Sequence, residues 1–304
     1  MITLKPGAGK SGIEKGLTMK PTFSGCVSRL MIDGRKIGQA ALIISSLLAA
    51  GVALGAESSW TKHPYLQDRW NVQLTLFYPD VSTTARLDNS TTGRGTEIDF
   101  EQDLDLTDRK ALGAFMGSVR LGEKWRIEAE YFALNRSGTR VINRDLSWGN
   151  ITFPVNTSVS SSFDTDVYRL SGGYSFIKDD KKEFGVALGL FVTDFKASLS
   201  TPTLGTSQGD TLAPLPTLGV YGAYAFTPKW LLSGRVDYFS LNYDNYDGSL
   251  TNFQVSVDYR FTRTFGVGVG YRYVDYNLEV SDSSWSGNVD YKFHGPTLYG
   301  VASF

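Results

Sequence analysis

The stretch from residue 250 to residue 280 alternates between apolar and polar side chains at every second position. The pattern runs from Phe253 to Phe261, and after a three-residue turn it resumes from Phe265 to Tyr273. Successive side chains of a β-strand point to opposite faces, so this stretch is predicted to form an antiparallel hairpin with one apolar and one polar face. Such a hairpin fits a soluble sheet over a core, or a membrane barrel with lipid on its apolar side.

The same alternation recurs along the chain from residue 70 onward, and helical periodicity is hard to find. Short turns, such as Gly122 to Lys124, alternate with longer polar connections, such as 89–108 and 202–213. This pattern of short turns and longer loops is typical of outer-membrane barrels, whose short turns lie on the periplasmic side. We therefore predict an all-β, antiparallel up-and-down transmembrane barrel of about ten strands, with eight or twelve as alternatives. The ten strands are expected at 70–88, 109–121, 125–142, 159–176, 184–201, 214–226, 230–244, 249–261, 265–280 and 285–304.

Aromatic residues mark the ends of these segments. Aromatic rings gather at membrane interfaces because they tolerate both hydrocarbon and water, whereas a soluble sandwich has no reason to ring one end with them. The girdle expected at the short-turn end consists of Trp70, Trp125, Phe176, Phe184, Phe226, Trp230, Phe261, Phe265 and Phe304. A second set, eight to ten residues farther along, is expected at the opposite edge of the apolar band: Tyr131, Tyr168, Phe195, Tyr238, Tyr273 and Tyr291.

The N-terminal part is interpreted as an export signal. Arg35 and Lys36 precede an apolar run from Ile37 to Ala56 that ends in small residues, which is the pattern of a secretory signal peptide; a membrane anchor is the alternative. We expect residues 1–56 to contain the signal peptide. If translation starts at Met31, residues 1–30 are an extension that is not translated. Residues 57–69 would then be a periplasmic N-terminal segment and 70–304 the barrel, exported through the Sec route.

Charge and cysteine content narrow the function classes. The whole chain has a formal net charge of −1, and removing the first 56 residues leaves 23 basic and 29 acidic residues, a net of −6. That balance provides no basic patch for nucleic acid. The single cysteine, Cys26, precedes the expected cleavage point, so the exported chain has neither a disulfide nor a thiol nucleophile.

In several strands the alternation slips about halfway along. Ile127, Ala129 and Tyr131 share one face, for example, but Phe132 and Leu134 then continue the apolar series on the other. A one-residue slip reverses the faces unless a bulge absorbs it. We therefore expect bulges, or the outer edge of the membrane, near the following residues, beyond which the strands continue above the membrane: Phe132, Asp194, Phe239, Asp275 and Gly295.

The polar faces carry charges of both signs. A barrel of this size holds only side chains or one small ligand, and buried charges must be paired. We expect a lumen network of Arg126, Glu128, Glu130, Arg169, Arg235, Asp237, Asp258, Arg260, Arg272, Asp290 and Lys292. A charge-lined pore or binding cavity is the alternative, and small lumen-facing residues leave space for it: Gly185, Ala187, Gly189, Gly219, Ala223, Gly266 and Gly268.

Candidate sites for chemistry are few. His63 precedes the first strand and is expected to be a flexible periplasmic residue, while His294 lies near the upper rim. The loop at 97–108 carries six carboxylates and is expected to be a solvated acidic loop, with Ca²⁺ binding as the alternative. We expect no cofactor, no metal and no enzyme activity.

The girdles, the signal peptide and the terminal Phe304 together resemble the bacterial outer-membrane β-barrel class. The segment around Gly268 to Tyr273 is similar to small barrels of the OmpA/OmpW kind, although those have eight strands. The resemblance implies a Gram-negative outer membrane, contact with lipids and lipopolysaccharide, and recognition of the last strand by the barrel assembly machinery. His294 matches neither the His-x-Ser pattern of barrel lipid A deacylases nor the Asp-x-His pattern of barrel proteases. The functional expectation is a structural or interaction protein with a charge-filled lumen; a narrow porin-like channel and a barrel lipid hydrolase are the alternatives.

Overall fold

The computed structural model describes residues 60–304 except 90–92, 94, 244–245 and 282–285. The expected signal peptide lies outside these residues. Two short helices are α2 (Pro64–Gln67) and α3 (Phe100–Leu104). The strands are β1 (Trp70–Phe77), β2 (Asp80–Leu87), β3 (Ile98–Asp99), β4 (Leu112–Leu121), β5 (Trp125–Val141), β6 (Leu146–Trp148), β7 (Ile151–Phe153), β8 (Ser158–Lys178), β9 (Lys182–Thr201), β10 (Gly205–Ala225), β11 (Trp230–Tyr243), β12 (Tyr246–Arg260), β13 (Phe265–Ser281) and β14 (Ser286–Ser303).

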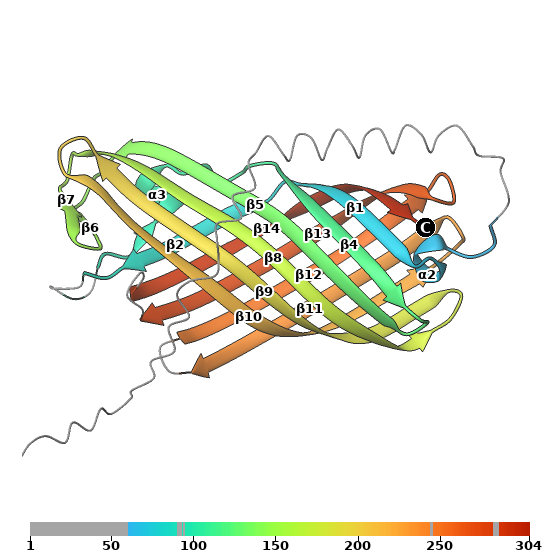
Figure 1. Ribbon diagram of the computed structural model, residues 1–304. Coiled ribbons are helices and arrows are strands. Elements are labelled where there is room, and N and C mark those ends of the chain that lie inside the picture. The colour runs from blue at the N-terminus through green and yellow to red at the C-terminus, as the bar shows by residue number, and fades with distance from the viewer. Residues whose placement is uncertain (1–59, 90–92, 94, 244–245, 282–285) are drawn as a thin grey trace, which may run out of the picture. The chain divides into compact units, whose positions relative to one another are not determined.

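The strands form a closed antiparallel barrel, as predicted (Figure 1). Each long strand pairs with its neighbour in sequence, and β1 pairs with both β4 and β14, which closes the ring. β2 continues the line of β1 and pairs with the other half of β14. The barrel therefore has ten strand positions, with β1 and β2 sharing one of them.

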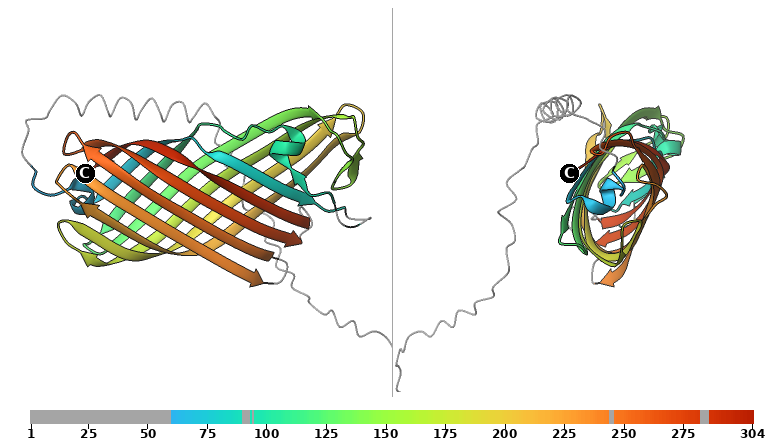
Figure 2. Two further views of the ribbon diagram at one scale, coloured as in Figure 1. Left: turned by 180° about the vertical axis from the view of Figure 1, so that it is seen from behind. Right: turned by 90° about the vertical axis from the view of Figure 1, so that its right-hand side faces the viewer.

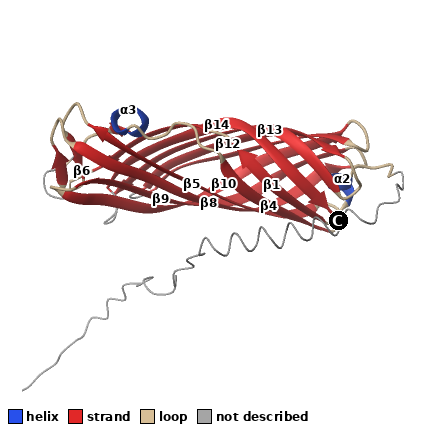
Figure 3. Ribbon diagram, turned by 90° about the horizontal axis from the view of Figure 1, so that it is seen from above, coloured by secondary structure: helices blue, strands red, loops and turns tan. Residues whose placement is uncertain are grey.

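The two ends of the barrel differ. The turn end carries the short connections 122–124, 179–181, 226–229 and 261–264, and the loop end carries 88–111 and 142–157. Figure 3 shows α2 at the turn end and α3 at the loop end. Neither of these helices, nor any other in the described part of the chain, is long and apolar enough to cross a membrane.

One predicted connection is wrong. Residues 202–213 were expected to form a long polar loop, but β10 begins at Gly205 and pairs with β9 from its first residue. The inward positions of this stretch hold small side chains such as Ser207 and Thr211, and Asp210 faces outward. Neither set of alternating side chains in this stretch is strongly apolar. The stretch therefore lacks the apolar–polar alternation from which the other strands were predicted.

The polarity of the two barrel faces inverts partway along the strands, without the predicted bulges. In β13 the outer face holds Val267 and Val269 near the turn end but Asp275 near the loop end, while the inner face changes from Arg272 to Tyr276. Pairing runs without a register shift through Phe132, Asp194, Phe239 and Asp275. The apparent slips are therefore inversions of polarity without a bulge, beyond which the barrel is apolar inside and polar outside.

The predicted irregularity near Gly295 lies in the facing strand. β14 runs continuously through Gly295, whereas the line of β1 and β2 is interrupted at Tyr78 and Pro79. The backbone N–H of Tyr78 donates to the carbonyl of Pro296 over 3.1 Å. A side chain at position 295 would stand 2.4 Å from the carbonyl oxygen of Tyr78, so glycine permits this close approach.

Candidate functional site

The turn-end half of the interior contains a network of ion pairs, some within one strand and others between different strands. Glu128 on β5 is contacted by Arg126 at 2.6 Å, by Arg169 of β8 at 3.5 Å and by Arg235 of β11. Glu130, two residues on, binds Arg169 at 2.9 Å and Arg272 of β13 at 2.5 Å. Alternation brings all of these side chains to the inner face because they occupy positions of one parity on each strand.

The network extends to further partners around the barrel. Asp237 binds Arg235 at 2.7 Å and accepts from the side-chain amide of Asn252 at 2.9 Å. Asn252 in turn accepts from Arg272 Nε at 3.1 Å, and the pair Asp258–Arg260 lies closer to the turn end at 3.1 Å. Nine of the eleven predicted lumen residues are therefore buried and paired inside the barrel.

Asp290 and Lys292 do not join this network, so their placement in the lumen was wrong. Both lie on the outer face of β14, where Lys292 pairs with Asp275 at 3.1 Å and Asp290 accepts from Asn288. They belong to the segment beyond the polarity inversion, where polar side chains point outward. Tyr291, between them, is buried inside.

Two buried ion pairs were not expected. Arg120 donates two hydrogen bonds of 2.9 Å to Glu183, and Arg136 binds Glu101 of α3. Arg136 occupies an even-numbered position on β5, as do Arg126, Glu128 and Glu130. Its inward orientation could therefore have been predicted from the alternation. Nothing in the sequence indicates the partner Glu101, because it lies in a connection.

The predicted girdle residues lie around the turn end. Eight of the nine have exposed side chains, and Phe265 is half-buried. In the second set, Tyr168 and Tyr238 are exposed, and Tyr131 and Tyr273 are half-buried on the outer face.

Phe195 and Tyr291 were wrongly assigned to that second set. Both are fully buried inside the barrel. They lie on the inner face beyond the polarity inversion, where the interior is apolar.

Helix α2 closes the turn end from inside the barrel, where Figure 2 shows it within the ring of strands. The Tyr65 hydroxyl accepts from Arg126 at 2.6 Å, Leu66 is buried, and His63 caps the helix by accepting from the Tyr65 N–H. His63 is thus a buried residue, not the flexible one that was expected. Its imidazole leaves solvent because the helix enters the lumen.

Three contacts fasten this N-terminal segment to three different turns. Lys62 pairs with Asp180 at 2.9 Å, and the Trp60 indole donates to the carbonyl of Pro228 at 3.0 Å. Arg263 makes a two-pronged ion pair with Asp68, with bonds of 2.9 and 2.6 Å. The segment 60–69 therefore acts as a plug, and we refer to it as the N-terminal plug.

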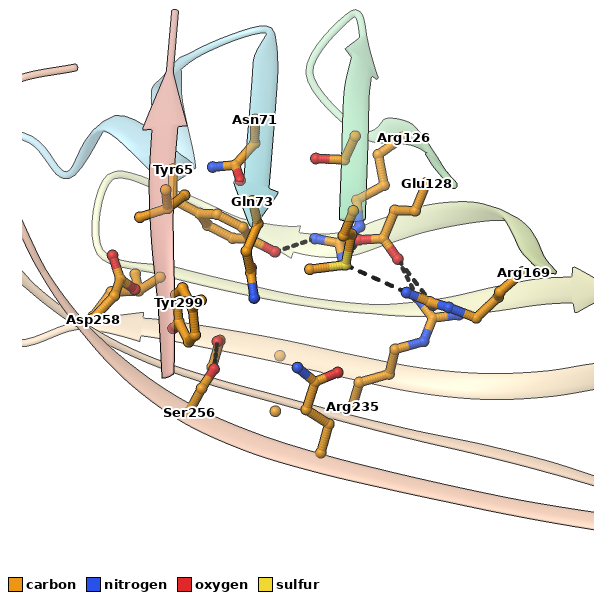
Figure 4. Close-up of a pocket in the computed structure, with 18 of the residues that line it drawn as sticks. Tyr65, Asn71, Gln73, Arg126, Glu128, Arg169, Arg235, Ser256, Asp258 and Tyr299 are labelled. Carbon is orange, nitrogen blue, oxygen red and sulfur yellow. Dashed lines mark hydrogen bonds and ion pairs between the residues drawn. The ribbon is translucent and has the colours of Figure 1, made fainter. Parts of the chain in front are cut away.

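A small polar cavity remains between the N-terminal plug and the ion network. It has a water-accessible volume of about 70 Å³, which is room for only a few water molecules. Figure 4 shows Tyr65 and Arg126 on one side of it and Ser256, Asp258 and Tyr299 on the other. The cavity is lined by residues of the N-terminal plug, of the ion network and of neighbouring strands.

The small inward residues do not create the space expected from the sequence. A side chain at Gly268 would stand 2.2 Å from the Tyr299 ring, and one at Gly219 would stand 2.2 Å from the Asp237 carboxylate. Tyr221 likewise covers Gly185. These glycines make room for large side chains of the facing strands, which fill the interior.

The interior beyond the ion network is an apolar core. Phe163, Phe195 and Tyr291 meet with ring centroids 5.5 to 6.1 Å apart, and Arg272 lies 4.9 Å from the ring of Phe132 at the boundary between network and core. Helix α3 enters this core with Phe100 and Leu104 fully buried.

The connection at 97–108 is therefore not the solvated acidic loop that was expected. Asp99 caps α3, Glu101 binds Arg136, and Asp103 binds Arg144 at 2.6 Å. Three of its carboxylates thus have partners in the chain. Among the described residues, no group of three or more histidine, cysteine, aspartate or glutamate side chains is arranged to hold a metal ion.

His294 lies on the outer face of β14. Its Nδ1 is 2.8 Å from the Tyr271 hydroxyl, and its ring stacks on Tyr273. Both tyrosines are on β13, and Tyr273 belongs to the second aromatic set.

We predict that the N-terminal plug loosens as the pH falls. Burial and the nearby Arg260 guanidinium lower the pKa of His63 from 6.5 to about 3, and its Nε2 is 3.6 Å from Asp258, which is itself bound to Arg260. The released plug binds the proton more readily than the docked one between these values. The docked state of His63 is therefore fully favourable above pH 6.5, and this contribution weakens as the pH falls below that value.

Hydrogen exchange of residues 60–69, corrected for the intrinsic pH dependence, measures this loss. The His63→Gln variant is the control, because its side chain does not titrate and its exchange should not follow the same pH curve. Equal protection at pH 7 and pH 5 in the unaltered chain would contradict the prediction.

Comparison with known proteins agrees with the geometry. No family model and no curated protein match the sequence. Similar solved structures include the outer-membrane protease OmpT of Escherichia coli, with a TM-score of 0.54 and 12% identity over 81% of this chain and 99% of that one. Others are the toluene transporter TodX of Pseudomonas putida (TM-score 0.31, 11% identity, 80% and 92% covered) and Neisserial surface protein A (0.29, 11%, 77% and 97%). This chain has the fold of the bacterial outer-membrane β-barrel proteins, built here from ten antiparallel strand positions.

Proposed function

We propose that this chain is a closed outer-membrane barrel of structural or interaction type, whose loop end projects from the membrane surface. The observation that supports this most directly is the occupied interior. The N-terminal plug, the ion network around Glu128 and Glu130, and the aromatic core with α3 follow one another along the barrel. An interior occupied by side chains at these three levels suits a scaffold or attachment surface better than a transport route.

The placement in the membrane is part of the same proposal. The apolar outer face between the two aromatic sets would meet lipid, with the turn end in the periplasm and the loop end outside a Gram-negative cell. The signal peptide would direct export through the Sec route. Phe304 exchanges backbone hydrogen bonds of 2.8 and 3.0 Å with Trp70 at the seam, where the assembly machinery would recognise the last strand.

The projecting part offers a rigid surface to partners. Beyond the polarity inversion the barrel has its own apolar core, so its outer face and the β6–β7 hairpin are supported from within. We propose lipopolysaccharide or components outside the cell as partners of this surface. Nucleic acid is not among the proposed partners, because the barrel carries a negative net charge.

A planar-bilayer recording tests the closed interior. We expect the purified chain to give no discrete openings, and a variant lacking residues 60–69 to remain silent, because the aromatic core still blocks the loop end. An open porin inserted under the same conditions serves as the positive control. The polar cavity of about 70 Å³ is the feature that favours a narrow channel instead, and regular openings of the unaltered chain would establish that alternative.

The proposal includes no catalytic role. Of the two histidines in the described part of the chain, His63 is enclosed by the plug and His294 faces outward against Tyr271. A barrel lipid hydrolase would alter the lipids of its own membrane. We therefore expect unchanged lipid A and phospholipid profiles in a deletion strain, and a shifted profile would overturn this part of the proposal.

A further inference from the structure

The charged network in the turn-end half of the barrel is not electrically balanced. It holds six arginines and five carboxylates, so the network carries one positive charge in excess. His63 adds no charge at neutral pH, because its pKa is about 3. The arginines are Arg120, Arg126, Arg169, Arg235, Arg260 and Arg272, and the carboxylates are Glu128, Glu130, Glu183, Asp237 and Asp258.

Changes in protonation of these side chains do not remove the excess. Arginine stays charged at physiological pH, and protonation of a carboxylate would only enlarge the positive excess. Burial raises the pKa of Tyr65, the tyrosine bound to Arg126, so its hydroxyl stays neutral. An uncompensated charge is costly in a buried region, and an anion taken from solution would compensate it.

Positive charge gathers around the small polar cavity beside the N-terminal plug. Four of the residues that line this cavity are arginines and two are carboxylates. Figure 4 shows Arg126, Arg169 and Arg235 around Glu128 at one end of the cavity, and Asp258 at the other. A water-accessible volume of about 70 Å³ is enough to enclose a small ion together with water.

The cavity is also lined by hydrogen-bond donors with unused capacity. The Tyr65 hydroxyl accepts from Arg126, which leaves its own proton to donate. The buried amide of Gln73 uses one N–H for the hydroxyl of Thr75 at 3.0 Å and retains the other. Arg126 is buried, and its Nε–H has no hydrogen-bond partner among the described residues. Neutral donors beside a cationic one are suited to an anion, because hydrogen bonds to a charged acceptor are the stronger kind.

We propose that this cavity binds one monovalent inorganic anion of halide size, with chloride as the natural occupant. The anion lies near Arg126 and accepts from the Tyr65 hydroxyl and the Gln73 amide. One excess positive charge matches one negative charge. A divalent anion such as sulfate would leave a negative excess and would lose more hydration on entering. Through Tyr65, the bound anion also joins the N-terminal plug to the barrel wall.

Urea unfolding of the full chain in detergent micelles, at matched ionic strength, tests the proposal. The salts are sodium chloride, sodium sulfate and sodium gluconate, whose anion is too large for the cavity. A dissociation constant of about 10 mM would raise the folding equilibrium constant about tenfold in about 100 mM chloride relative to gluconate. Sulfate strengthens apolar burial in any protein, so each salt effect is taken relative to a variant without the site.

Gln254→Glu is that variant, because it supplies the negative charge from the protein itself. Gln254 lines the cavity and lies opposite Arg235 on β11 and Arg272 on β13. The variant should be at least as stable as the unaltered chain in gluconate, and its gain in chloride should fall below about twofold. Gln208→Glu makes the same change on the exposed outer face of β10 and should keep the full gain. An undiminished chloride gain in Gln254→Glu, or an equal relative gain in sulfate, would overturn the proposal.

Bromide crystallography locates the anion without any unfolding measurement. Crystals of the unaltered chain grown in sodium bromide should give an anomalous peak inside the cavity, within hydrogen-bonding distance of the Tyr65 hydroxyl. The peak should be absent from crystals of Gln254→Glu and weaker in Tyr65→Phe, which removes one donor without changing the charge. Bromide peaks confined to the outer surface would mean an adventitious ion only and would overturn the proposal.

Discussion

Glu128→Gln is expected to destabilise the folded barrel by about 3–5 kcal/mol, the typical cost of removing one partner from a buried ion pair. Glu128 is contacted by Arg126, Arg169 and Arg235, and all four side chains are buried. The neutral amide would leave three buried guanidinium groups with less compensating charge.

Urea unfolding of the barrel in lipid vesicles, followed by tryptophan fluorescence, measures this loss. Asp290→Asn is a matched control, because Asp290 carries the same charge but is exposed on the outer face of β14. Its effect should stay within about 0.5 kcal/mol. If the two substitutions had similar small effects, the ion network would not be a buried, mutually dependent set.

Arg136→Met is expected to release α3 from the loop end and to cost about 3–5 kcal/mol. Arg136 is fully buried, and it binds Glu101 and the hydroxyl of Thr83. Methionine would fill much of the volume but leave the Glu101 carboxylate without a cationic partner, with the Thr83 N–H at 2.8 Å as its remaining hydrogen-bond donor. The expected result is faster hydrogen exchange across residues 98–106 together with the lower stability.

A second substitution tests whether the unpaired carboxylate is the cause. Glu101→Leu combined with Arg136→Met removes both charges, and replacing a buried pair by apolar groups is often nearly neutral. The double variant should therefore recover part of the loss, since the Thr83 N–H loses its acceptor Glu101. Arg144→Met is the control, because its pair with Asp103 is half-exposed and should contribute less than about 1 kcal/mol. A double variant no more stable than Arg136→Met would mean that packing, not charge, holds α3.

The strands could be predicted from the sequence because alternation is a local property of each segment. The hairpin of β12 and β13 was readable residue by residue, and so was the girdle from Trp70 to Phe304. Most of the charged side chains inside the barrel could be predicted from the alternation along each strand. Arg126, Glu128 and Glu130, for example, occupy successive inward positions on β5.

What could not be predicted depends on contacts between distant segments. The partner of Arg136 lies 35 residues away in a connection, and the burial of His63 requires the N-terminal plug to fold back into the lumen. Asp290 and Lys292 were misplaced for another reason. Their positions were interpreted as if the polar face were always the inner one, whereas the polarity of the two faces inverts along β14.

The polarity inversion makes strand length sensitive to the number of residues inserted. One residue added near Val274 in β13 would reverse every later side chain, placing Tyr276 outside and Glu279 inside the aromatic core. Two added residues would preserve both faces and only lengthen the projecting wall. The strands beyond the polarity inversion can therefore change in length by steps of two residues, whereas a single insertion or deletion reverses the two faces unless a bulge absorbs it.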